Sequence, residues 1–288
     1  MKSYLSLIKF SHTIFALPFA LIGTMWGFHT LPTGFSWDKW DLILKVVLCM
    51  VFARSAAMAF NRYIDRDIDA QNVRTQIREI PAGIISPQNA LFFIIINCLL
   101  FVITTKFINN LCFYLSPVAL LVVLGYSLTK RFTALCHLVL GLGLSLAPIG
   151  AFFAVTGSVE HSQAAIVLSF AVLFWTGGFD IIYALQDEAF DRENKLNSIP
   201  AKVGKVRALM ISNVLHVFTG ILILAFGYLI GGSLLFWVGA AVFIALLAYQ
   251  HFLVKPTDLS KVNLAFFTTN GIASVTFAVF VLADAYMQ

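Results

Sequence analysis

Two clusters of carboxylates in this chain of 288 residues have the residue types and spacing of a divalent-cation site. The members that recur at intervals of four residues are Asn61, Asp65 and Asp69 in the first cluster and Tyr183, Asp187 and Asp191 in the second. Side chains four residues apart lie on one face of a helix, so each cluster forms a polar stripe. Mg²⁺ takes oxygen ligands, usually one or two carboxylates together with substrate phosphates. The two stripes therefore predict a Mg²⁺ site for a diphosphate, with Asp65, Asp69, Asp187 and Asp191 as its metal ligands.

Basic residues accompany both clusters. Four carboxylates in a medium of low dielectric constant would repel each other strongly, so cations must neutralise them. Four basic residues lie at the same ends of the apolar segments as the acids and are expected to complete an anion clamp: Arg74, Arg78, Lys130 and Arg131. Further candidate substrate-binding residues are Lys9, Arg54, Gln186 and Asp180. Arg54 lies well inside an apolar segment, where a charge is costly and is a functional candidate by default.

The two clusters match when one is laid over the other. Asn61 then falls on Tyr183, and each cluster ends an apolar segment and precedes a basic loop that contains proline. This weak internal repeat is of the kind that places a site at the interface between two halves of a membrane protein.

The elements that must position these residues are membrane helices. The chain has 60% hydrophobic and 11% charged residues and a mean hydropathy of +0.89, against about 25% charged residues in a soluble domain. Such a chain cannot bury its side chains in one aqueous core, so lipid must be the solvent of its outer surface. With no polar linker to divide the sequence, we expect one membrane domain over residues 1–288.

A spanning helix needs roughly 20 mostly apolar residues. Nine segments meet this requirement, at residues 10–31, 41–61, 88–107, 111–128, 134–156, 164–185, 207–230, 233–253 and 264–285. The predicted fold is therefore an all-α bundle of about nine transmembrane helices around a central cavity. The small-residue pairs Gly141–Gly143 and Gly177–Gly178 would let helices approach closely.

The Lys and Arg residues predict the orientation of the bundle. Nearly all of them fall on one side of the alternating spans, which by the positive-inside rule is the cytoplasmic side. The N-terminus, both acidic clusters and two cap loops near 62–87 and 186–206 are expected there, in a bacterial plasma membrane. Because topology accounts for the net charge of +5, we expect no nucleic-acid partner, and no obligate protein partner is evident.

The cysteines and histidines do not predict a metal site. Cys49, Cys98, Cys112 and Cys136 are scattered through apolar segments, and the six histidines show no metal-ligand spacing. Both sets are expected to be structural.

At the level of motifs, the chain resembles the UbiA superfamily of intramembrane prenyltransferases. Its first cluster fits the pattern NxxxDxxxD, and residues 180–191 fit DxxYxxQDxxxD. The segment Tyr126–Thr133 and the basic start of the chain around Lys9 are also similar to the family, so the resemblance covers nearly the whole chain. The run 54–65 resembles the branch that is 4-hydroxybenzoate polyprenyltransferase-like, which is thought to include enzymes of menaquinone synthesis. Arg62 and the Glu79-Ile80 pair between Arg78 and Pro81 depart from the usual family pattern.

This resemblance implies Mg²⁺-dependent transfer of a polyprenyl group from polyprenyl diphosphate to a phenolic aromatic acid in quinone biosynthesis. The four aspartates would bind Mg²⁺–diphosphate, and the basic residues would hold the diphosphate and an acceptor carboxylate. Asn61 and Tyr183 would lie near the ionising allylic carbon. The acceptor is a small acid such as 4-hydroxybenzoate, with a dihydroxynaphthoate of menaquinone biosynthesis as the alternative.

Three other classes remain as alternatives. An ion-coupled transporter also has intramembrane acids, but these usually lie at the midplane rather than at one membrane face. A CDP-alcohol phosphotransferase would carry Gly and Ala-Arg between its acids, and neither cluster does. A purely structural membrane subunit leaves the duplicated acidic stripes unexplained.

Overall fold

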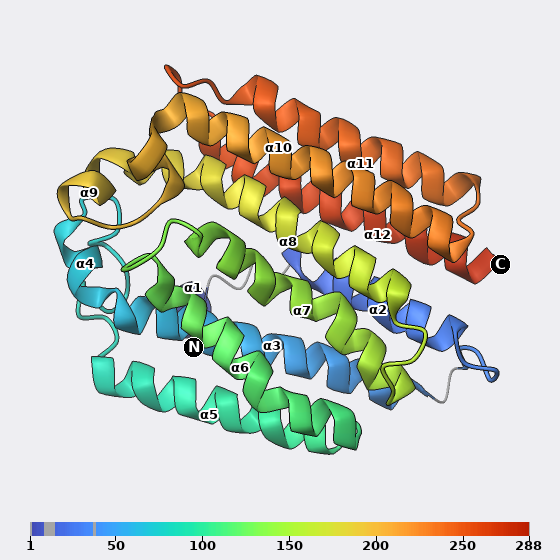
Figure 1. Ribbon diagram of the computed structural model, residues 1–288. Coiled ribbons are helices and arrows are strands. Elements are labelled where there is room, and N and C mark those ends of the chain that lie inside the picture. Colours follow the sequence, from blue (N-terminus) through green and yellow to red (C-terminus); the bar gives the residue numbers. More distant parts are fainter. Residues whose placement is uncertain (1, 9–14, 37–38, 288) are drawn as a thin grey trace.

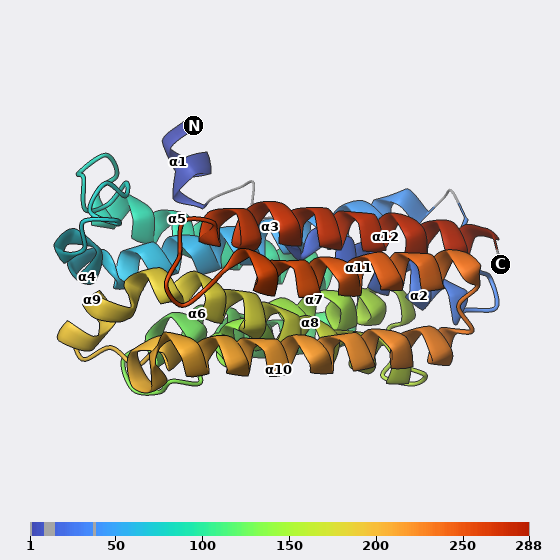
Figure 2. The ribbon, with the colours of Figure 1, turned by 90° about the horizontal axis from the view of Figure 1, so that it is seen from above.

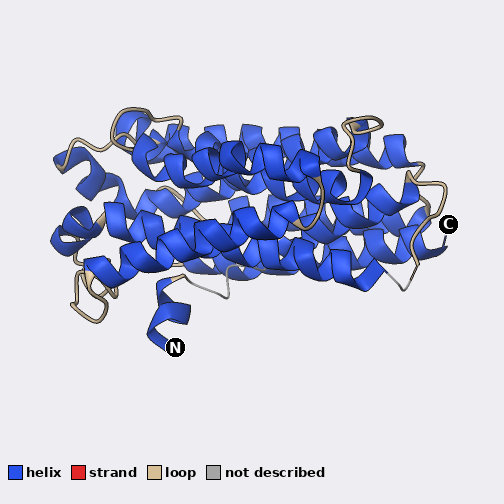
Figure 3. Cartoon of the chain, turned by 90° about the horizontal axis from the view of Figure 1, so that it is seen from below, coloured by secondary structure: helices blue, strands red, loops and turns tan. Residues whose placement is uncertain are grey.

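The computed structural model describes residues 2–8, 15–36 and 39–287. Long helices run side by side along one bundle (Figure 1), and the described residues form helices and loops without a strand (Figure 3). The prediction of an all-α bundle is confirmed.

Eight segments of the described chain are long and apolar enough to cross a bilayer. Their helices are α3 (Trp40–Ile64), α5 (Pro87–Lys106), α6 (Asn110–Thr129), α7 (Cys136–Thr156), α8 (Gln163–Ala184), α10 (Ile199–Ile230), α11 (Leu234–Leu253), and η4 (Leu264–Thr269) with α12 (Asn270–Met287). Helix α2 (Leu17–His29) takes the place of the predicted first span, whose residues 10–14 lie outside the described part. The prediction of about nine helices is thus confirmed, and the chain is an integral membrane protein.

Helix starts follow local capping chemistry. Ser86 accepts a hydrogen bond from the amide of Asn89 at the start of α5, and Ser198 accepts one from Ala201 at the start of α10. The predicted start of α10 at residue 207 is therefore too late by two turns. Gly204 has a φ of 78° inside this helix, so the first turn is separated from the long apolar part by a kink. Charge and hydropathy alone detected only the part after the kink.

Short helices gather at one end of the bundle. They are α4 (Arg66–Gln71), the single turn η3 (Leu185–Asp187) and α9 (Glu188–Glu193). Helices α4 and α9 lie near each other at one end, whereas the C-terminus lies at the other end (Figure 1). The two predicted cap segments thus contain helical turns that follow directly on α3 and α8.

Helix α1 (Lys2–Leu7) stands apart from the long helices, on one side of the bundle near α5 (Figure 2). Leu7 packs with Ile80 and Ile85 in one buried cluster, and the Ser6 hydroxyl donates to Glu79 Oε1 at 2.5 Å. The start of the chain is therefore attached to the segment that follows α4.

Helix α8 is central to the packing and lies against α7 and α10. Its Trp175 is fully buried in an aromatic cluster with Phe19, Phe243 and Phe277. A Cβ added to Gly141 of α7 would lie 2.3 Å from the carbonyl oxygen of Leu173. The expected close approach of small residues is therefore present at the α7–α8 crossing.

Candidate active site

A polar cavity of about 290 Å³ lies at the end of the bundle that carries α4 and α9. Among the residues that line it are eleven of the predicted ones: Arg54, Asn61, Asp65, Asp69, Arg74, Arg78, Lys130, Arg131, Asp180, Tyr183 and Asp187. Asp191 is fully buried behind this wall, and Gln186 donates to the carbonyl of Tyr183 outside it. Lys9 lies outside the described residues. Both halves of the sequence repeat thus contribute to one cavity.

Each of the four predicted metal ligands pairs with a different basic side chain. The pairs are Asp65–Arg131 at 2.9 Å, Asp69–Arg78 at 2.6 Å, Asp187–Arg74, and Asp191–Lys130 at 2.7 Å. The four basic residues predicted as an anion clamp are therefore the counter-ions of the four acids in this structure. Such pairing offsets the cost of holding several charges away from water.

The Asp187 carboxylate connects the two halves of the site. Arg74 Nε donates to Asp187 Oδ1 at 3.0 Å, and Asn72 Nδ2 donates to the same oxygen at 3.3 Å. Arg74 Nη1 also donates to the Tyr183 hydroxyl at 2.8 Å. Asn72 and Arg74, which follow the first cluster, thus form hydrogen bonds with Tyr183 and Asp187 of the second cluster.

The first cluster is held at the junction of α3 and α4. Helix α3 ends at Ile64, and Asp65 accepts from Asn61 Nδ2 at 3.2 Å and from Arg131 Nη2 at 2.9 Å. Burial raises the pKa of Asp65, although the nearby Arg131 opposes the shift. Burial also raises the pKa of Asp69 to about 6. Burial raises both pKa values because it disfavours the charged form of a carboxylate.

Tyr183 is fixed by the helix that faces it. Its ring stacks on Phe266 with centroids 4.2 Å apart, and Phe266 belongs to the π-helical segment η4. Asn270 Nδ2 donates to the carbonyls of Ala265 and Phe266 at 3.1 and 2.9 Å. Widened turns of this kind often occur at functional sites, and this one directs Phe266 at the candidate site.

The same asparagine is itself held by two other helices. Its Oδ1 accepts from Trp175 Nε1 at 2.9 Å and from Gln250 Nε2 at 2.7 Å. Asn270, Gln250 and Trp175 are all fully buried. The η4 segment is thus fastened to α8 and α11 by buried side-chain hydrogen bonds.

Two arginines on α3 have buried donor atoms without a hydrogen-bond partner. These are Nε of Arg54, and Nε and Nη1 of Arg62. Both residues line the polar cavity. A buried donor that has no partner costs roughly 1–3 kcal/mol and more when it is charged. The two side chains are therefore candidates for contact with an anion.

The donor set fits Mg²⁺ shared with a phosphate. Among the described residues, no group of three or more His, Cys, Asp or Glu is arranged to hold a metal ion by itself. Mg²⁺ commonly uses one or two carboxylates and completes its shell with substrate phosphates and water. The carboxylates are spread around one cavity and do not form a closed cage, and this arrangement fits a Mg²⁺ ion that is shared with a phosphate.

Sequence reasoning did not single out several residues that line the polar cavity, among them Asn72, His137 and Phe266. His137 Nδ1 lies 2.7 Å from Asp180 Oδ2, and its Nε2 accepts from the amide of Ile199. An ionisable residue within an apolar span is a signal that could have identified His137. Phe266 carries no such signal, because it is one of 28 phenylalanines.

Comparison with known proteins identifies the family. The sequence profile of the UbiA prenyltransferase family matches residues 17–272, which include both acidic clusters, seven of the nine predicted spans in full and parts of the other two. The chain belongs to the UbiA prenyltransferase family.

Relatives with similar sequences align over most of their length. The chain is 30% identical over 280 residues to the 4-hydroxybenzoate octaprenyltransferase of Nitrosomonas europaea, covering 96% of this chain and 93% of that protein. It is 28% identical over 278 residues to the enzyme of the same name from Aliivibrio salmonicida, covering 96% and 95%.

Solved structures share the fold. A UbiA homologue from Aeropyrum pernix superposes with a TM-score of 0.81 at 27% identity, covering 96% of this chain and 97% of that one. A UbiA homologue from Archaeoglobus fulgidus bound to DMAPP and Mg²⁺ superposes with a TM-score of 0.74 at 23% identity, covering 99% and 100%.

Proposed function

We propose that this protein is a Mg²⁺-dependent prenyltransferase that joins a polyprenyl group to a phenolic aromatic acid. The observation that carries the proposal is the polar cavity. Both members of three of the four acid–base pairs line its wall. Mg²⁺ held by Asp65, Asp69, Asp187 and Asp191 would supply Lewis-acid stabilisation to a leaving diphosphate.

The basic residues have a second role in this proposal. With cations on the carboxylates, Arg74, Arg78, Lys130 and Arg131 would be free to bind diphosphate oxygens. Guanidinium and ammonium groups form strong charge-assisted hydrogen bonds with phosphates. They stabilise the negative charge that grows on the diphosphate as the allylic carbon–oxygen bond breaks.

The reaction exchanges one bond for another. The bond between the allylic carbon and the diphosphate breaks, and the electron pair leaves with the diphosphate. A ring carbon beside the phenolic hydroxyl then forms the new carbon–carbon bond and loses its proton to a carboxylate or to the diphosphate. Tyr183 would stabilise the allylic cation through its ring face. Arg74 now lies 5.1 Å from the centre of that ring, so this role requires Arg74 to move to the diphosphate.

Arg54 is the residue that we assign to the acceptor carboxylate. It lies seven residues before Asn61 on α3, about 10 Å deeper in the bundle, and its Nε has no partner. An aromatic acid with its hydroxyl near Asn61 and its carboxylate near Arg54 would span this interval. We infer 4-hydroxybenzoate as the acceptor because the relatives compared above are named for it. A dihydroxynaphthoate offers the same two groups and is the alternative.

We also propose that the polar cavity faces the cytoplasm of a bacterial cell. The N-terminal segment, α4 and α9 lie in regions rich in Lys and Arg, as the positive-inside rule requires. The prenyl donor would then meet the protein from the lipid, and the aromatic acid from the aqueous side.

The acceptor is tested by prenyl transfer in membranes that contain the expressed protein. A labelled polyprenyl diphosphate is supplied with 4-hydroxybenzoate or 1,4-dihydroxy-6-naphthoate in parallel, with and without EDTA. We expect a prenylated hydroxybenzoate that EDTA abolishes. Product from the naphthoate alone would replace the acceptor and leave the reaction class intact. No product from either, with the protein correctly inserted, would contradict the proposal.

A further inference from the structure

Arg62 of α3 is a buried cation in the wall of the polar cavity, and it is 4% exposed. Its Nε and Nη1 have no hydrogen-bond partner among the described residues. Within the same part of the chain, no carboxylate forms an ion pair with it, unlike the four bases of the anion clamp. A guanidinium is not deprotonated in proteins, so the charge of Arg62 needs an anion as its partner.

The two aspartates that follow Arg62 are already paired with other bases. Asp65 accepts from Arg131 at 2.9 Å, and both oxygens of Asp69 accept from Arg78 Nη1, at 2.6 and 2.7 Å. The charge of Arg62 acts on both carboxylates from beyond ion-pair distance. Arg62 therefore lies beside two proposed metal ligands and is the counter-ion of neither.

Glu79 does not neutralise Arg62 in the structure. This glutamate is 8% exposed, and its Oε1 accepts a hydrogen bond from the Ser6 hydroxyl at 2.5 Å. Its Oε2 has no partner among the described residues, and Glu79 does not line the polar cavity. Arg62 and Glu79 both belong to the departures from the usual family pattern. A pair between them would satisfy both side chains, so Glu79 is the competitor, within the protein, of any anion at Arg62.

The wall of the polar cavity carries more basic than acidic side chains. Six are basic and four are acidic: Arg54, Arg62, Arg74, Arg78, Lys130 and Arg131, with Asp65, Asp69, Asp180 and Asp187. Four of the six bases form ion pairs with aspartates of the two clusters. The other two are Arg54 and Arg62, so the cavity attracts an anion even without a metal cation.

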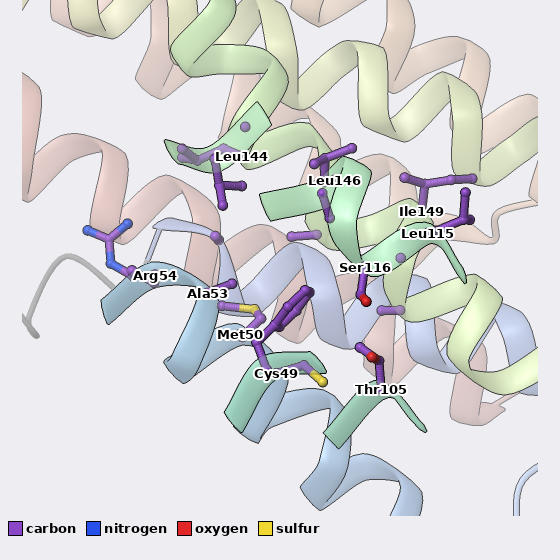
Figure 4. A pocket seen from close by; sticks show the side chains of 18 of the residues that line it. Cys49, Met50, Ala53, Arg54, Thr105, Leu115, Ser116, Leu144, Leu146 and Ile149 are labelled. Atoms are coloured by element: carbon purple, nitrogen blue, oxygen red, sulfur yellow. The ribbon is translucent and has the colours of Figure 1, made fainter. Parts of the chain in front are cut away.

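Arg54 and Arg62 serve different parts of the polar cavity. Eight residues separate them on α3, about 12 Å along the helix axis. Arg54 lies at one end of a second, apolar cavity (Figure 4), where we place the acceptor carboxylate. Arg62 directly follows Asn61 and precedes Asp65 by about one helical turn. An anion bound to Arg62 therefore lies at the level of the aspartates, where the proposed function places the phosphates.

We propose that Arg62 forms an anion site in the polar cavity that binds a diphosphate without Mg²⁺. The inference rests on the proposed function and adds a binding step that does not need the metal. The four bases of the anion clamp need a cation on their aspartates before they are free, whereas Arg62 can donate to phosphate oxygens at once. A diphosphate would thus be held beside Asp65 and Asp69 when Mg²⁺ arrives. The same chemistry fits the prenyl donor and the inorganic diphosphate that the reaction releases.

The unpaired charge of Arg62 should also lower the stability of the protein without ligand. Replacement of a buried ion by an apolar side chain of similar volume is often neutral or stabilising. The Tm of Arg62→Met without ligand should therefore equal or exceed that of the wild type. A structural ion pair between Arg62 and Glu79 predicts the opposite, a Tm that falls in Arg62→Met.

Arg66 provides the matched control. It lies four residues further along the chain, in α4, and it does not line the polar cavity. Its Nη1 donates to the carbonyl of Tyr63 at 2.8 Å. The variant Arg66→Met therefore removes the same charge as Arg62→Met from the same region, outside the cavity. The variant Arg62→Lys keeps the charge but loses the planar set of donors, so its affinity should lie between those of the wild type and Arg62→Met.

The test measures the affinity of the purified protein in lipid nanodiscs for inorganic diphosphate, by calorimetry in EDTA at constant ionic strength. We expect the wild type to bind, Arg62→Met to bind at least about tenfold more weakly, and Arg66→Met to match the wild type. No binding by the wild type, or an equal affinity in Arg62→Met, would overturn the inference. An equal affinity together with a lower Tm in Arg62→Met would assign Arg62 to Glu79.

Two further arms separate the sources of the ligand and protect the proposed function. Geranyl thiolodiphosphate, a donor analogue that does not ionise readily, is titrated in EDTA in the same way. If Arg62→Met weakens both ligands, Arg62 serves the donor and the product, whereas a loss for inorganic diphosphate alone would confine the site to the product. Both titrations are repeated with Mg²⁺. Binding that appears only with Mg²⁺ would overturn the inference alone, and no binding under either condition would contradict the proposed function as well.

Discussion

The acidic side chains of the polar cavity and their basic partners depend on one another. Removal of one member of a buried pair leaves the other without compensation, which commonly costs 3–5 kcal/mol. In the structure, Arg74 and Arg131 compensate Asp187 and Asp65. A ligand that carries both cations and anions, such as Mg²⁺–diphosphate, can replace both members at once.

The variant Asp187→Asn tests this dependence. It removes a proposed metal ligand and leaves Arg74 without its carboxylate, so we expect the rate of prenyl transfer to fall at least about 100-fold. The control is Asp67→Asn, because the Asp67 side chain is 81% exposed and does not line the cavity. Equal activity in the two variants, each folded and inserted in the membrane, would show that Asp187 has no role at the metal site.

The variant Arg54→Met tests the acceptor site. Loss of a charge-assisted hydrogen bond of about 1.5–3 kcal/mol should raise the KM for 4-hydroxybenzoate roughly 10- to 150-fold. The KM for the donor should change little, because Arg54 lies about 10 Å deeper in the bundle than Asn61 and forms none of the ion pairs with the four aspartates. For an acceptor without a carboxylate, the KM should be the same in the wild type and in Arg54→Met. If Arg54→Met affects that acceptor as strongly, the guanidinium does not bind the carboxylate.

The pH dependence of Mg²⁺ binding follows from Asp69. Its pKa is raised to about 6 by burial, so the protein holds a proton there below pH 6 that Mg²⁺ must displace. Between pH 7 and pH 5, the Mg²⁺ concentration that half-saturates diphosphate binding should rise about tenfold for this one proton. In Asp69→Asn the rise should be smaller. A half-saturating concentration that does not change over this range would contradict the assignment.

The residue spacing was sufficient to predict most of this site. The four-residue intervals placed Asp65 and Asp187 on polar stripes, and the structure brings both stripes to one cavity. The pairing of each acid with a particular base could not be predicted, because it depends on contacts between distant segments. Asn72 was missed for the same reason, since its partner Asp187 lies 115 residues away.

At the scale of elements, the crossing of α7 and α8 sets the wall of the site. Gly141 permits the approach, because any Cβ there would lie 2.3 Å from the backbone of Leu173. The variant Gly141→Ala should therefore push the helices apart, at a cost of about 1–3 kcal/mol. Gly125→Ala is the control, and should be neutral or slightly stabilising, by up to about 1 kcal/mol. Thermal unfolding in detergent should show a lower Tm for the first variant only, and equal Tm values would contradict this account of the crossing.

The helices themselves were predictable, because each apolar segment must satisfy its backbone within the bilayer. Their ends were less predictable. The kink at Gly204 lies in a basic stretch that precedes the apolar part of α10, and the π-helical turn at η4 lies within an apolar segment. The η4 turn depends on Asn270, whose side chain replaces hydrogen bonds that a regular helix would make. Hydropathy carries no information about such a local change. The η4 turn nevertheless positions Phe266 against Tyr183.

At the scale of the whole molecule, two cavities with opposite chemistry adjoin inside one membrane bundle. The polar cavity suits a diphosphate and an aromatic acid, and an apolar cavity of about 290 Å³ between α3, α5, α6 and α7 suits a hydrocarbon (Figure 4). The two cavities share a border at Arg54, Met58, Tyr126, Leu140 and Leu144. Their shared border would bring the reacting carbon of an amphipathic donor next to the acceptor, away from water. This arrangement explains why the chemistry of a charged leaving group is located in a membrane protein.

The central claim is that the polar cavity cleaves a prenyl diphosphate and transfers the prenyl group to an aromatic ring. The most direct measurement is the amount of inorganic diphosphate released per prenylated aromatic product, with Mg²⁺ and purified protein in lipid. We predict one diphosphate for each product molecule, and neither product from Asp187→Asn. Diphosphate release that continues without acceptor prenylation, or prenylation that is unchanged in Asp187→Asn, would contradict the claim.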